Sequence, residues 1–341
     1  MNDPQEQYRA VQATAPGELV LTELPLREPP PGHVRIRVEA CGVCHSDGAT
    51  VDALFPVEYP RVPGHEAVGR IDAVGEGVED WSKSDRVGVG WLGGQCNHCA
   101  HCRRGDFVNC ENQPVTGLDV DGGYAEEMIA RETGLVRIPA ELESVAAAPL
   151  LCAGLTTFNA LRDSPARPGD LVAIIGLGGL GHLAVQHARH MGFRVVAIAR
   201  GPEKRDLAKE LGAHRYIDSV ATDPAAELLA LGGATVIVGT AASSEASAHL
   251  VPGLAPGGTL VVVGIGAEPL EISAADLVFG GRHLGGSLTG SPADGEDTLD
   301  FSTLQGIRAR TEVFGLSEAS HAYARMAANE ARFRIVLDTS R

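Results

Sequence analysis

The feature that most restricts the fold of this chain is an alternation of strand and helix patterns that begins at Pro149. Buried strands are predicted at Leu171–Ile175 and Arg194–Ala199, and again in the later segments TVIVGT and TLVVVGIG. Helices are predicted between them, at Leu180–Met191 and Glu203–Leu211. Such alternation is typical of a parallel sheet with helices on both faces. We therefore predict an α/β fold with a doubly wound parallel sheet.

The loop between the first predicted strand and helix, GLGGLG, contains Gly176, Gly178 and Gly181 in the spacing G-x-G-x-x-G. In a strand–turn–helix unit the first glycine permits a tight turn, and the second lets the backbone approach a pyrophosphate. The third lets the helix pack on the strand, and the helix N-terminus supplies N–H groups and a partial positive charge. We therefore predict a dinucleotide-binding Rossmann domain over residues 149–290, whose loop also binds the cofactor through Gly179 and Leu180. A glycine-rich crossover without a ligand is the alternative.

The end of the second predicted strand, RVVAIARGPEK, indicates which nicotinamide cofactor is bound. NAD-binding domains commonly place Asp or Glu there, where it binds the ribose 2′-hydroxyl. Here Ala199 is followed by Arg200, and the strand end has no carboxylate. Arg200, as the main contact, and Lys204 can instead meet a 2′-phosphate. NADP is therefore predicted in preference to NAD, and a solvated basic turn is the alternative.

Residues 1–148 differ in texture from the segment that follows. Clusters of Gly and Pro such as EPPPGH and YPRVPGHE separate short alternating or apolar runs, HVRIRVEA among them. This pattern predicts an irregular, β-rich domain. After Gly290 the chain becomes polar and helical, and it ends on the apolar strand FRIVLD. Two domains are expected because a chain of 341 residues exceeds the size that one core usually serves.

Charge and hydropathy argue against several classes of partner. The chain has 28 basic and 44 acidic residues and a formal net charge of -16, whereas nucleic acids and anionic membranes bind clustered Lys and Arg. The longest weakly polar run, LVAIIGLGGLG, is about half a membrane span, and His182 ends it. The N-terminus MNDPQEQYRA lacks the basic start and apolar core of a signal peptide. We expect a cytoplasmic protein with no nucleic-acid or membrane partner.

Four of the seven cysteines lie in one short segment, CNHCAHCRRGDFVNC, with the spacing C-x2-C-x2-C-x7-C. Tight C-x2-C spacing in a reducing compartment favours a metal site over a disulfide framework. Four thiolates fill the tetrahedral sphere of zinc and leave no position for a substrate, so such a site is structural. A nucleic-acid-binding zinc ribbon is the alternative, and the acidic charge argues against it. The predicted ligands of this lobe, residues 96–110, are Cys96, Cys99, Cys102 and Cys110.

Catalytic chemistry must then come from the remaining cysteines and the twelve histidines. The segment CGVCHSD contains Cys44, PGHEAVG contains His65, and Cys152 lies much further along the chain. A zinc ion with three protein ligands of mixed sulfur and nitrogen is the catalytic pattern. Spacing alone cannot join residues a hundred positions apart, and an isolated cysteine is more often a small buried core residue.

These segments resemble a known family. The motifs CGVCHSD, GHEAVGRIDAVGEGV, the four-cysteine lobe, LLCAGLTTF and GLGGLG occur in the same order as in the zinc-dependent medium-chain alcohol dehydrogenases. The resemblance covers essentially the whole chain, to the closing VLDTS, and Gly64–Val78 fits the family's zinc signature at every fixed position. Chain length and LLCAGLTTF are most similar to the yeast and bacterial tetrameric branch. The strand end AIARGPEK is more similar to the NADP-using cinnamyl-alcohol-type relatives.

The resemblance implies a β-rich, GroES-like catalytic domain, to which residues 291–341 return, beside the Rossmann domain. It implies a second, catalytic zinc ion on Cys44, His65 and Cys152, with water or Glu66 in the fourth place. Cys41 has no role in the family pattern and is interpreted as a core residue.

The resemblance also implies the roles of residues around that zinc. Ser46 corresponds to the residue that hydrogen-bonds the substrate oxygen and starts a proton relay, and Asp47 to an acid that orients the zinc-bound histidine. One departure concerns the relay, because many relatives have histidine where this chain has Ala49. The proton then leaves through water, or the relay is slower.

Further contacts are implied for the cofactor, the substrate and the assembly. His45 and Arg334 correspond to residues that contact the cofactor pyrophosphate. Trp91, with Leu54 or Phe55, corresponds to the wall of the alcohol pocket, although Trp and Phe are more often core residues. The segment HLGGSLTG corresponds to a strand that pairs between subunits in relatives, so a homo-oligomer is expected, and a tetramer by resemblance only.

The expected function is a zinc-dependent oxidoreductase that transfers a hydride between an alcohol and a nicotinamide cofactor. The physiological substrate is not specified by the sequence, and a polyol or formaldehyde dehydrogenase is an alternative of the same class. Two further alternatives are a zinc-free quinone or enoyl reductase and a non-catalytic, zinc-stabilised binding protein. The reductase would need none of the candidate zinc ligands, and the binding protein would be expected to lack at least one ligand of the open site.

Overall fold

The computed structural model describes residues 6–341. Residues 1–5 lie outside the described residues, and they include the start of the expected β-rich domain and half of the N-terminal segment MNDPQEQYRA. The chain forms two compact units. The first unit comprises the described residues up to Cys152 together with Gly290–Leu304 and Arg308–Arg341. The second unit comprises Ala153–Thr289 and Gln305–Ile307.

The second unit contains a six-stranded sheet in which every pairing is parallel. The strand order is β10-β9-β8-β11-β12-β13, so the order reverses between β8 and β11, where doubly wound sheets bind their ligands. The strands are β8 (Leu171–Ile175), β9 (Arg194–Ala199), β10 (Arg215–Asp218), β11 (Ala234–Gly239), β12 (Leu254–Val262) and β13 (His283–Gly286).

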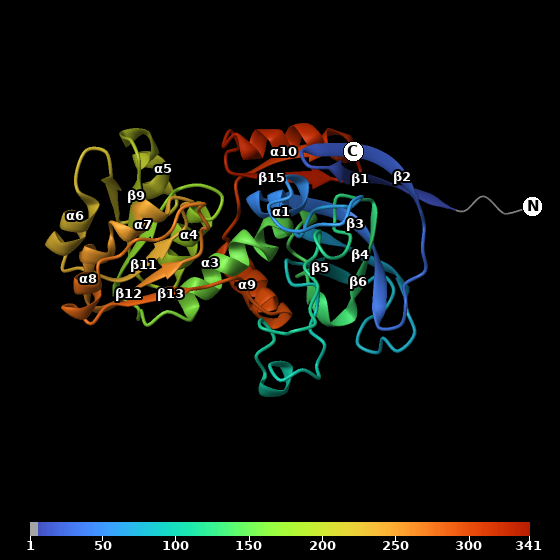
Figure 1. Ribbon diagram of the computed structural model, residues 1–341, viewed down its shortest axis with the longest axis horizontal. Coiled ribbons are helices and arrows are strands. Elements are labelled where there is room, and N and C mark those ends of the chain that lie inside the picture. Colours follow the sequence, from blue (N-terminus) through green and yellow to red (C-terminus); the bar gives the residue numbers. More distant parts are fainter. Residues whose placement is uncertain (1–5) are drawn as a thin grey trace, which may run out of the picture. The chain divides into compact units, whose positions relative to one another are not determined.

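Helices accompany this sheet (Figure 1). Its strands contribute side chains to two separate groups of buried apolar residues. Val172 and Ile174 belong to one group and Ala173 and Ile175 to the other, because successive side chains of a strand point to opposite faces. The α/β fold predicted from the sequence is confirmed. The helices are α3 (Ala153–Arg162), α4 (Gly181–His190), α5 (Arg205–Glu210), α6 (Pro224–Ala230), α7 (Ser244–Ala248) and α8 (Ala274–Val278).

Two predicted helices of this unit are shorter than expected. The helix predicted at Leu180–Met191 is α4, Gly181–His190. The helix predicted at Glu203–Leu211 is α5, Arg205–Glu210, which follows a 3-10 turn at Pro202–Lys204. Proline fixes its own φ and has no N–H, so it suits this first turn.

The first unit is built on a mainly antiparallel seven-stranded sheet of order β14-β15-β3-β4-β5-β7, with β6 paired to β3, and on a separate β1-β2 hairpin. The final strand, β15, lies antiparallel to β3, and the last segment of the chain therefore belongs to this unit. Its strands are β1 (Gln7–Ala15), β2 (Glu18–Pro25), β3 (His33–Val43), β4 (Ala67–Val74), β5 (Arg86–Val89), β6 (Glu127–Arg131), β7 (Leu135–Arg137), β14 (Thr311–Gly315) and β15 (Arg334–Asp338).

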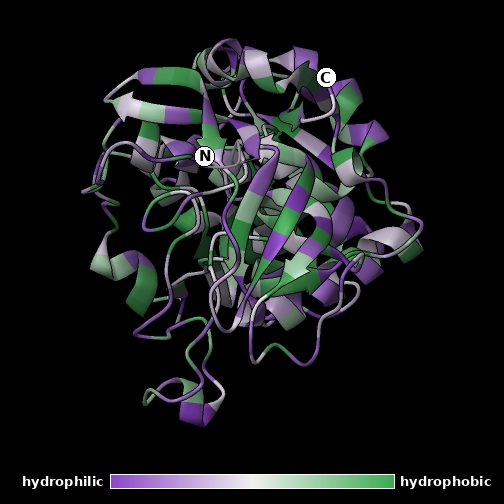
Figure 2. Cartoon of the chain, turned by 90° about the vertical axis from the view of Figure 1, so that its right-hand side faces the viewer, coloured by the Kyte–Doolittle hydropathy of each residue, from purple (hydrophilic) through white to green (hydrophobic). Residues whose placement is uncertain are grey.

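Strands of this unit carry hydrophobic and hydrophilic residues in alternation, as Figure 2 shows. In β3, Val34, Ile36 and Val38 are buried in the core of the unit. The helices of the unit are α1 (Gly48–Val51), α2 (Ser144–Ala147), α9 (Pro292–Gln305) and α10 (Ala319–Ala327).

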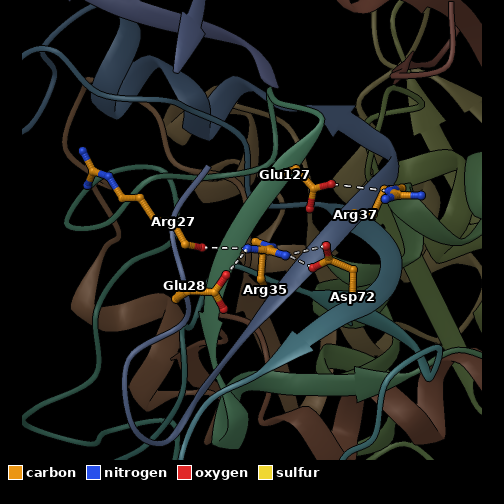
Figure 3. Close-up of polar contacts among 6 residues, drawn as sticks. All are labelled: Arg27, Glu28, Arg35, Arg37, Asp72 and Glu127. Atoms are coloured by element: carbon orange, nitrogen blue, oxygen red, sulfur yellow. Dashed lines mark hydrogen bonds and ion pairs between the residues drawn. The ribbon is translucent and has the colours of Figure 1, made fainter. Parts of the chain in front are cut away.

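Ion pairs join the β3, β4 and β6 strands (Figure 3). Arg35 of β3 binds Asp72 of β4 through two hydrogen bonds, Nε to Oδ1 at 2.8 Å and Nη2 to Oδ2 at 2.9 Å. Arg37, two residues along β3, lies 3.4 Å from Glu127 of β6. Paired arginine–carboxylate bonds add geometric specificity, so this cluster supports the strand register.

Among residues 6–341, no single helix is long and apolar enough to cross a membrane. The pair Ser144–Leu151 and Ala153–Arg162 passes the same test of length and composition only when its two helices are taken together.

Candidate active site

The four-cysteine lobe forms a closed cluster of sulfur atoms. The Sγ atoms of Cys96, Cys99, Cys102 and Cys110 all lie within 4.8 Å of one another. Two of the separations, Cys96 to Cys102 and Cys99 to Cys110, are 4.0 Å. Four sulfurs around zinc at about 2.3 Å would be about 3.8 Å apart, so the cluster fits a tetrahedral zinc ion.

Backbone amides of the lobe point at its own sulfurs. The N–H groups of Cys99 and Cys102 donate to the Sγ atoms of Cys96 and Cys99, each at 3.4 Å. The backbone N–H of His98 is the main cause that lowers the pKa of Cys96 to about 5. Burial instead raises the pKa of Cys102 to about 12. The backbone amides thus stabilise the thiolate of Cys96, the form in which cysteine binds a metal, whereas burial opposes it at Cys102.

A second cluster joins Cys44, His65, Glu66 and Cys152, whose ligand atoms all lie within 4.8 Å of one another. Cys44 directly follows β3, and His65 and Glu66 directly precede β4, the antiparallel neighbour of β3. Cys152 follows the 3-10 turn Ala148–Leu151, and its Sγ is 4.0 Å from that of Cys44. Strand pairing, together with this 3-10 turn, therefore brings together residues that are far apart in the sequence.

The donor atoms of this cluster fit a divalent metal. His65 Nε2 and Glu66 Oε2 are buried, and neither has a hydrogen-bond partner within the described chain. Unpartnered buried polar atoms are costly and uncommon, so these two atoms call for a ligand. His65 Nδ1 lies 2.8 Å from Asp47 Oδ1, which leaves Nε2 as the lone-pair nitrogen. Two sulfurs and an imidazole with one further position match an open zinc site.

The ionisable groups of this cluster perturb one another strongly. Burial raises the pKa of Glu66 to about 7, although the charge of Arg334 opposes the shift. Burial alone would lower the pKa of His65, but the Asp47 carboxylate outweighs it and the pKa lies well above its usual value. A hydrogen bond from Cys152 lowers the pKa of Cys44. Metal ligands bind in the deprotonated form. A divalent cation bound here would therefore displace protons from the cysteine, histidine and glutamate side chains of the cluster.

Arg334 is the buried cation beside this cluster. It starts β15, is 5 % exposed, and its Nη2 donates to Glu66 Oε1. Gly42 makes room for the carboxylate, because a Cβ atom at this position would lie 1.8 Å from Glu66 Oε2. The expected contact of Arg334 with a cofactor pyrophosphate stays a prediction.

The other residues predicted near this cluster differ in how far they are exposed. His45 and Ser46 are exposed although they adjoin the buried Cys44. The Trp91 ring meets the His65 ring edge-on, with 4.8 Å between centroids. Leu54 and Phe55 are 70 % and 57 % exposed, respectively, so neither is a core residue. Ala49, at the position of the missing relay histidine, is buried.

The glycine loop of the second unit has the geometry that its spacing predicts. Gly176 has a φ of +97°, which favours glycine. Gly178 is exposed, and a Cβ there would meet nothing within 4 Å, so the backbone can be approached closely. A Cβ on Gly181 would lie 1.9 Å from the Gly176 carbonyl oxygen, which shows how closely helix α4 packs on the turn. Gly179 and Leu180, which lie between Gly178 and Gly181 in the sequence, are half-buried.

The basic residues after β9 lie at the surface of the same unit. Arg200 is exposed and Lys204 is half-buried. Asp218 at the end of β10 accepts a hydrogen bond from the Gly201 N–H at 2.9 Å and another from Val220 N–H at 3.0 Å. This carboxylate was not predicted from the sequence, because it belongs to the neighbouring strand.

Comparisons with known proteins agree with this geometry. The model of the zinc-binding dehydrogenase family matches residues 179–303, and that of the alcohol dehydrogenase GroES-like domain matches residues 30–140. The chain is 42 % identical to alcohol dehydrogenase notN of Aspergillus sp. (strain MF297-2) over 337 residues, which cover 99 % of each protein. The chain belongs to the zinc-dependent alcohol dehydrogenase family. An alcohol dehydrogenase of Geobacillus stearothermophilus is 40 % identical over 90 % of this chain and 91 % of that protein.

Solved structures of alcohol dehydrogenases share this fold. A cinnamyl alcohol dehydrogenase from Sorghum bicolor has a TM-score of 0.89 and 32 % identity, with 98 % of each chain covered. A Helicobacter pylori structure described as CAD complexed with NADP(H) has a TM-score of 0.86 and 27 % identity, with 99 % of each chain covered. The chain is therefore a zinc-dependent alcohol oxidoreductase, and the predicted family, fold class and general function are confirmed.

Two further residues of this alcohol dehydrogenase were not predicted from the sequence. Gly42 gives space to Glu66, and Tyr124 donates a hydrogen bond from its hydroxyl to Asp47 Oδ2 at 2.8 Å. The only available signal was the segment DVDGGYAEE, in which two glycines precede a tyrosine. Nothing in that segment indicates which carboxylate the hydroxyl would reach.

Proposed function

We propose that this alcohol dehydrogenase interconverts a primary or secondary alcohol and the matching aldehyde or ketone, with NADP(H) used in preference to NAD(H). The observation that carries the proposal is the buried cluster of Cys44, His65 and Cys152 with the unpartnered carboxylate oxygen of Glu66. Formaldehyde is a second candidate substrate, because AdhA of Bacillus subtilis, 38 % identical over 91 % of each protein, is described as a probable formaldehyde dehydrogenase. A polyol is the other alternative of the same class.

In this proposal Cys44, His65 and Cys152 hold a catalytic zinc ion, and Glu66 or water takes the fourth place. A zinc ion bound there supplies Lewis acidity that lowers the pKa of an alcohol, and the nicotinamide accepts or supplies the hydride. Asp47 keeps the His65 ring oriented through the 2.8 Å contact at Nδ1.

The proton and the substrate are handled by residues around that cluster. Ser46 is exposed beside Cys44, so its hydroxyl can accept the proton of the substrate. Because Ala49 cannot carry a proton, we propose that water receives it from Ser46. Trp91 forms one wall of the alcohol pocket, and the exposed Leu54 and Phe55 provide further apolar surface for the substrate.

The proposed cofactor site comprises the glycine loop Gly176–Gly181, with Arg200 and Lys204 at the 2′-phosphate and His45 and Arg334 at the pyrophosphate. The test is a panel of primary and secondary alcohols, polyols, formaldehyde and larger aldehydes, assayed with both cofactors in wild type and Arg200→Ala. Loss of one phosphate contact should lower kcat/KM with NADP(H) by about tenfold and leave the value with NAD(H) nearly unchanged. Equal changes with both cofactors would contradict the assignment of Arg200.

Two zinc ions per chain are proposed, one in the lobe and one in the open site. Cys44→Ser should leave one zinc per chain, abolish turnover and keep cofactor binding. Cys99→Ser is the matched variant in the lobe, and it should reduce stability first because structural zinc contributes folding free energy. A zinc-free reductase would contain no zinc, and a non-catalytic binding protein would contain only the lobe zinc. Full activity in Cys44→Ser would contradict the proposed mechanism.

A homo-oligomer, proposed as a tetramer, is supported by the sheet edge of the second unit. β13 is the last strand of the described sheet, and the nearby Val278, Phe279 and Leu284 are 74 %, 90 % and 46 % exposed. Leu284 lies on the edge strand itself, and Val278 and Phe279 lie at the end of helix α8, which precedes it. An unpaired strand edge with exposed apolar side chains beside it favours pairing with a second copy. Light scattering should give four chains, and Phe279→Arg should reduce that number. None of the seven cysteines, all of which lie in the described residues, forms a disulfide, and this supports a cytoplasmic location.

A further inference from the structure

The segment before β6 carries a buried hydroxyl to the open metal site. Tyr124 is 0 % exposed, and its hydroxyl donates to Asp47 Oδ2 at 2.8 Å. The same Oδ2 accepts the backbone N–H of Cys44 at 2.9 Å, and Oδ1 lies 2.8 Å from His65 Nδ1. The Asp47 carboxylate is therefore surrounded by two proposed metal ligands and one tyrosine. In the described part of the chain, no arginine or lysine forms an ion pair with it.

The position of the Tyr124 ring is determined by the backbone that leads to His65. The N–H of Tyr124 donates to the Pro63 carbonyl at 3.0 Å, and that of Gly123 to the Gly64 carbonyl at 2.9 Å. Gly64 has a φ of +99°, and a Cβ there would lie 2.4 Å from Cδ1 of the tyrosine ring. The ring is thus packed directly against the residue before His65. Its hydroxyl is held in place by contacts that do not involve a metal.

Two donors on Oδ2 fix the rotation of the Asp47 carboxylate and hence the direction of Oδ1. One of these donors, the Cys44 N–H, belongs to the same short turn as Asp47, so it moves with that turn. The tyrosine hydroxyl comes from a separate segment and ties the turn to the chain before His65. Rotation of the carboxylate would move Oδ1 away from His65 Nδ1 and release the ring.

We propose that Tyr124 is a positioning residue for the open metal site, where its hydroxyl holds Asp47 so that Asp47 can hold His65. The inference rests on the proposed function, in which Cys44, His65 and Cys152 bind a metal. Outer partners of metal ligands typically affect metal affinity or activity by about 10–100-fold when they are removed. Tyr124 acts through Asp47 and does not touch the metal, so its loss should weaken metal binding more than it changes the fold.

The test is metal retention in Tyr124→Phe, which removes the hydroxyl and keeps the ring against Gly64. Loss of zinc to a chelator should be about tenfold faster or more from the open site, while the lobe zinc leaves at the wild-type rate. Tyr323→Phe is the matched control, because it also removes a buried tyrosine hydroxyl bonded to a carboxylate, that of Asp52 at 2.5 Å. Cobalt substitution adds an independent readout, since a released His65 should change the absorption bands of the open site only.

The outcomes separate this inference from the proposed function. Fewer than two zinc ions in the wild-type protein would overturn the proposed function. Two zinc ions in the wild type, with equal retention in Tyr124→Phe and Tyr323→Phe, would overturn only the role of Tyr124.

A double-mutant cycle with Asp47→Asn tests the route of the effect. Asp47→Asn alone should speed the loss of the open-site zinc at least as much as Tyr124→Phe does. Unchanged zinc retention in Asp47→Asn would overturn the inference, and this result would hold even if Tyr124→Phe did not fold. In the Asp47→Asn background, Tyr124→Phe should add less than about a twofold change. A full further tenfold change would show that the hydroxyl acts by another route and would overturn the inference.

Discussion

The substitution Gly42→Ala tests the packing of the Glu66–Arg334 pair most directly. A Cβ at residue 42 would lie 1.8 Å from Glu66 Oε2 and 2.8 Å from its Cδ, whereas ordinary contact begins at 3.4 Å. The carboxylate must therefore move by about 1.6 Å, which breaks its bond to Arg334. Arg334 is 5 % exposed and would keep an unpaired buried charge. Breaking a buried ion pair in this way costs about 3–5 kcal/mol.

Equilibrium unfolding in urea, followed by tryptophan fluorescence at a fixed free zinc concentration, measures this cost. The chain has two tryptophans, Trp81 and Trp91, and both belong to the first unit, so the signal reports that unit. With a urea dependence of about 1–3 kcal/mol per M, the midpoint should fall by about 1 M or more.

Gly315→Ala at the end of β14 is the matched control for this substitution. It lies in the same unit, and its Cβ would meet nothing closer than 3.3 Å. Its free energy of unfolding should therefore stay within about 0.5 kcal/mol of wild type. If Gly42→Ala unfolded at the midpoint of Gly315→Ala, the carboxylate would not occupy the place beside Gly42, and the assigned pair would be wrong.

Two further predictions concern the second unit. Burial, with the nearby His182 and His190, lowers the pKa of His187 from 6.5 to about 3. Between these two pH values the unfolded chain binds a proton that the folded chain does not. Stability that is present above pH 6.5 is therefore lost as the pH falls toward 3, by up to about 5 kcal/mol. Unfolding of His187→Gln, followed by circular dichroism, should depend less on pH over this range, and an unchanged dependence would exclude His187 as the cause. Gly181→Ala would place a Cβ 1.9 Å from the Gly176 carbonyl oxygen, so cofactor affinity measured by calorimetry should fall at least tenfold. Unaltered affinity would mean that this loop does not approach the cofactor.

Local patterns were sufficient for the parts of the structure that are local. The strand predicted at Leu171–Ile175 is β8, since five apolar residues between turns can be buried on both faces of a parallel sheet. The lobe cysteines could also be predicted, because all four lie within 96–110 and the short chain between them supplies its own amide donors.

The open cluster could not be derived in the same way. Its members Cys44, His65 and Cys152 meet only through strand pairing and a turn beyond the sheet. The residues alone therefore identified possible metal ligands, and only the family resemblance indicated which three belong to one site. Tyr124 and Gly42 stayed unpredicted because a tyrosine or a glycine does not indicate in sequence which distant carboxylate it will contact.

The electrostatics of the open cluster follow from the register of three neighbouring strands. Cys41 of β3 pairs with Ala67 of β4, which places the turn that follows β3 beside the residues that precede β4. On the other side Val43 of β3 pairs with Ile335 of β15, so Arg334 enters the same end of the sheet. A slip of one residue in β15 would turn the arginine to the opposite face and leave Glu66 buried without its cation. The apolar residues that fix this register therefore also set the charge at the proposed metal site.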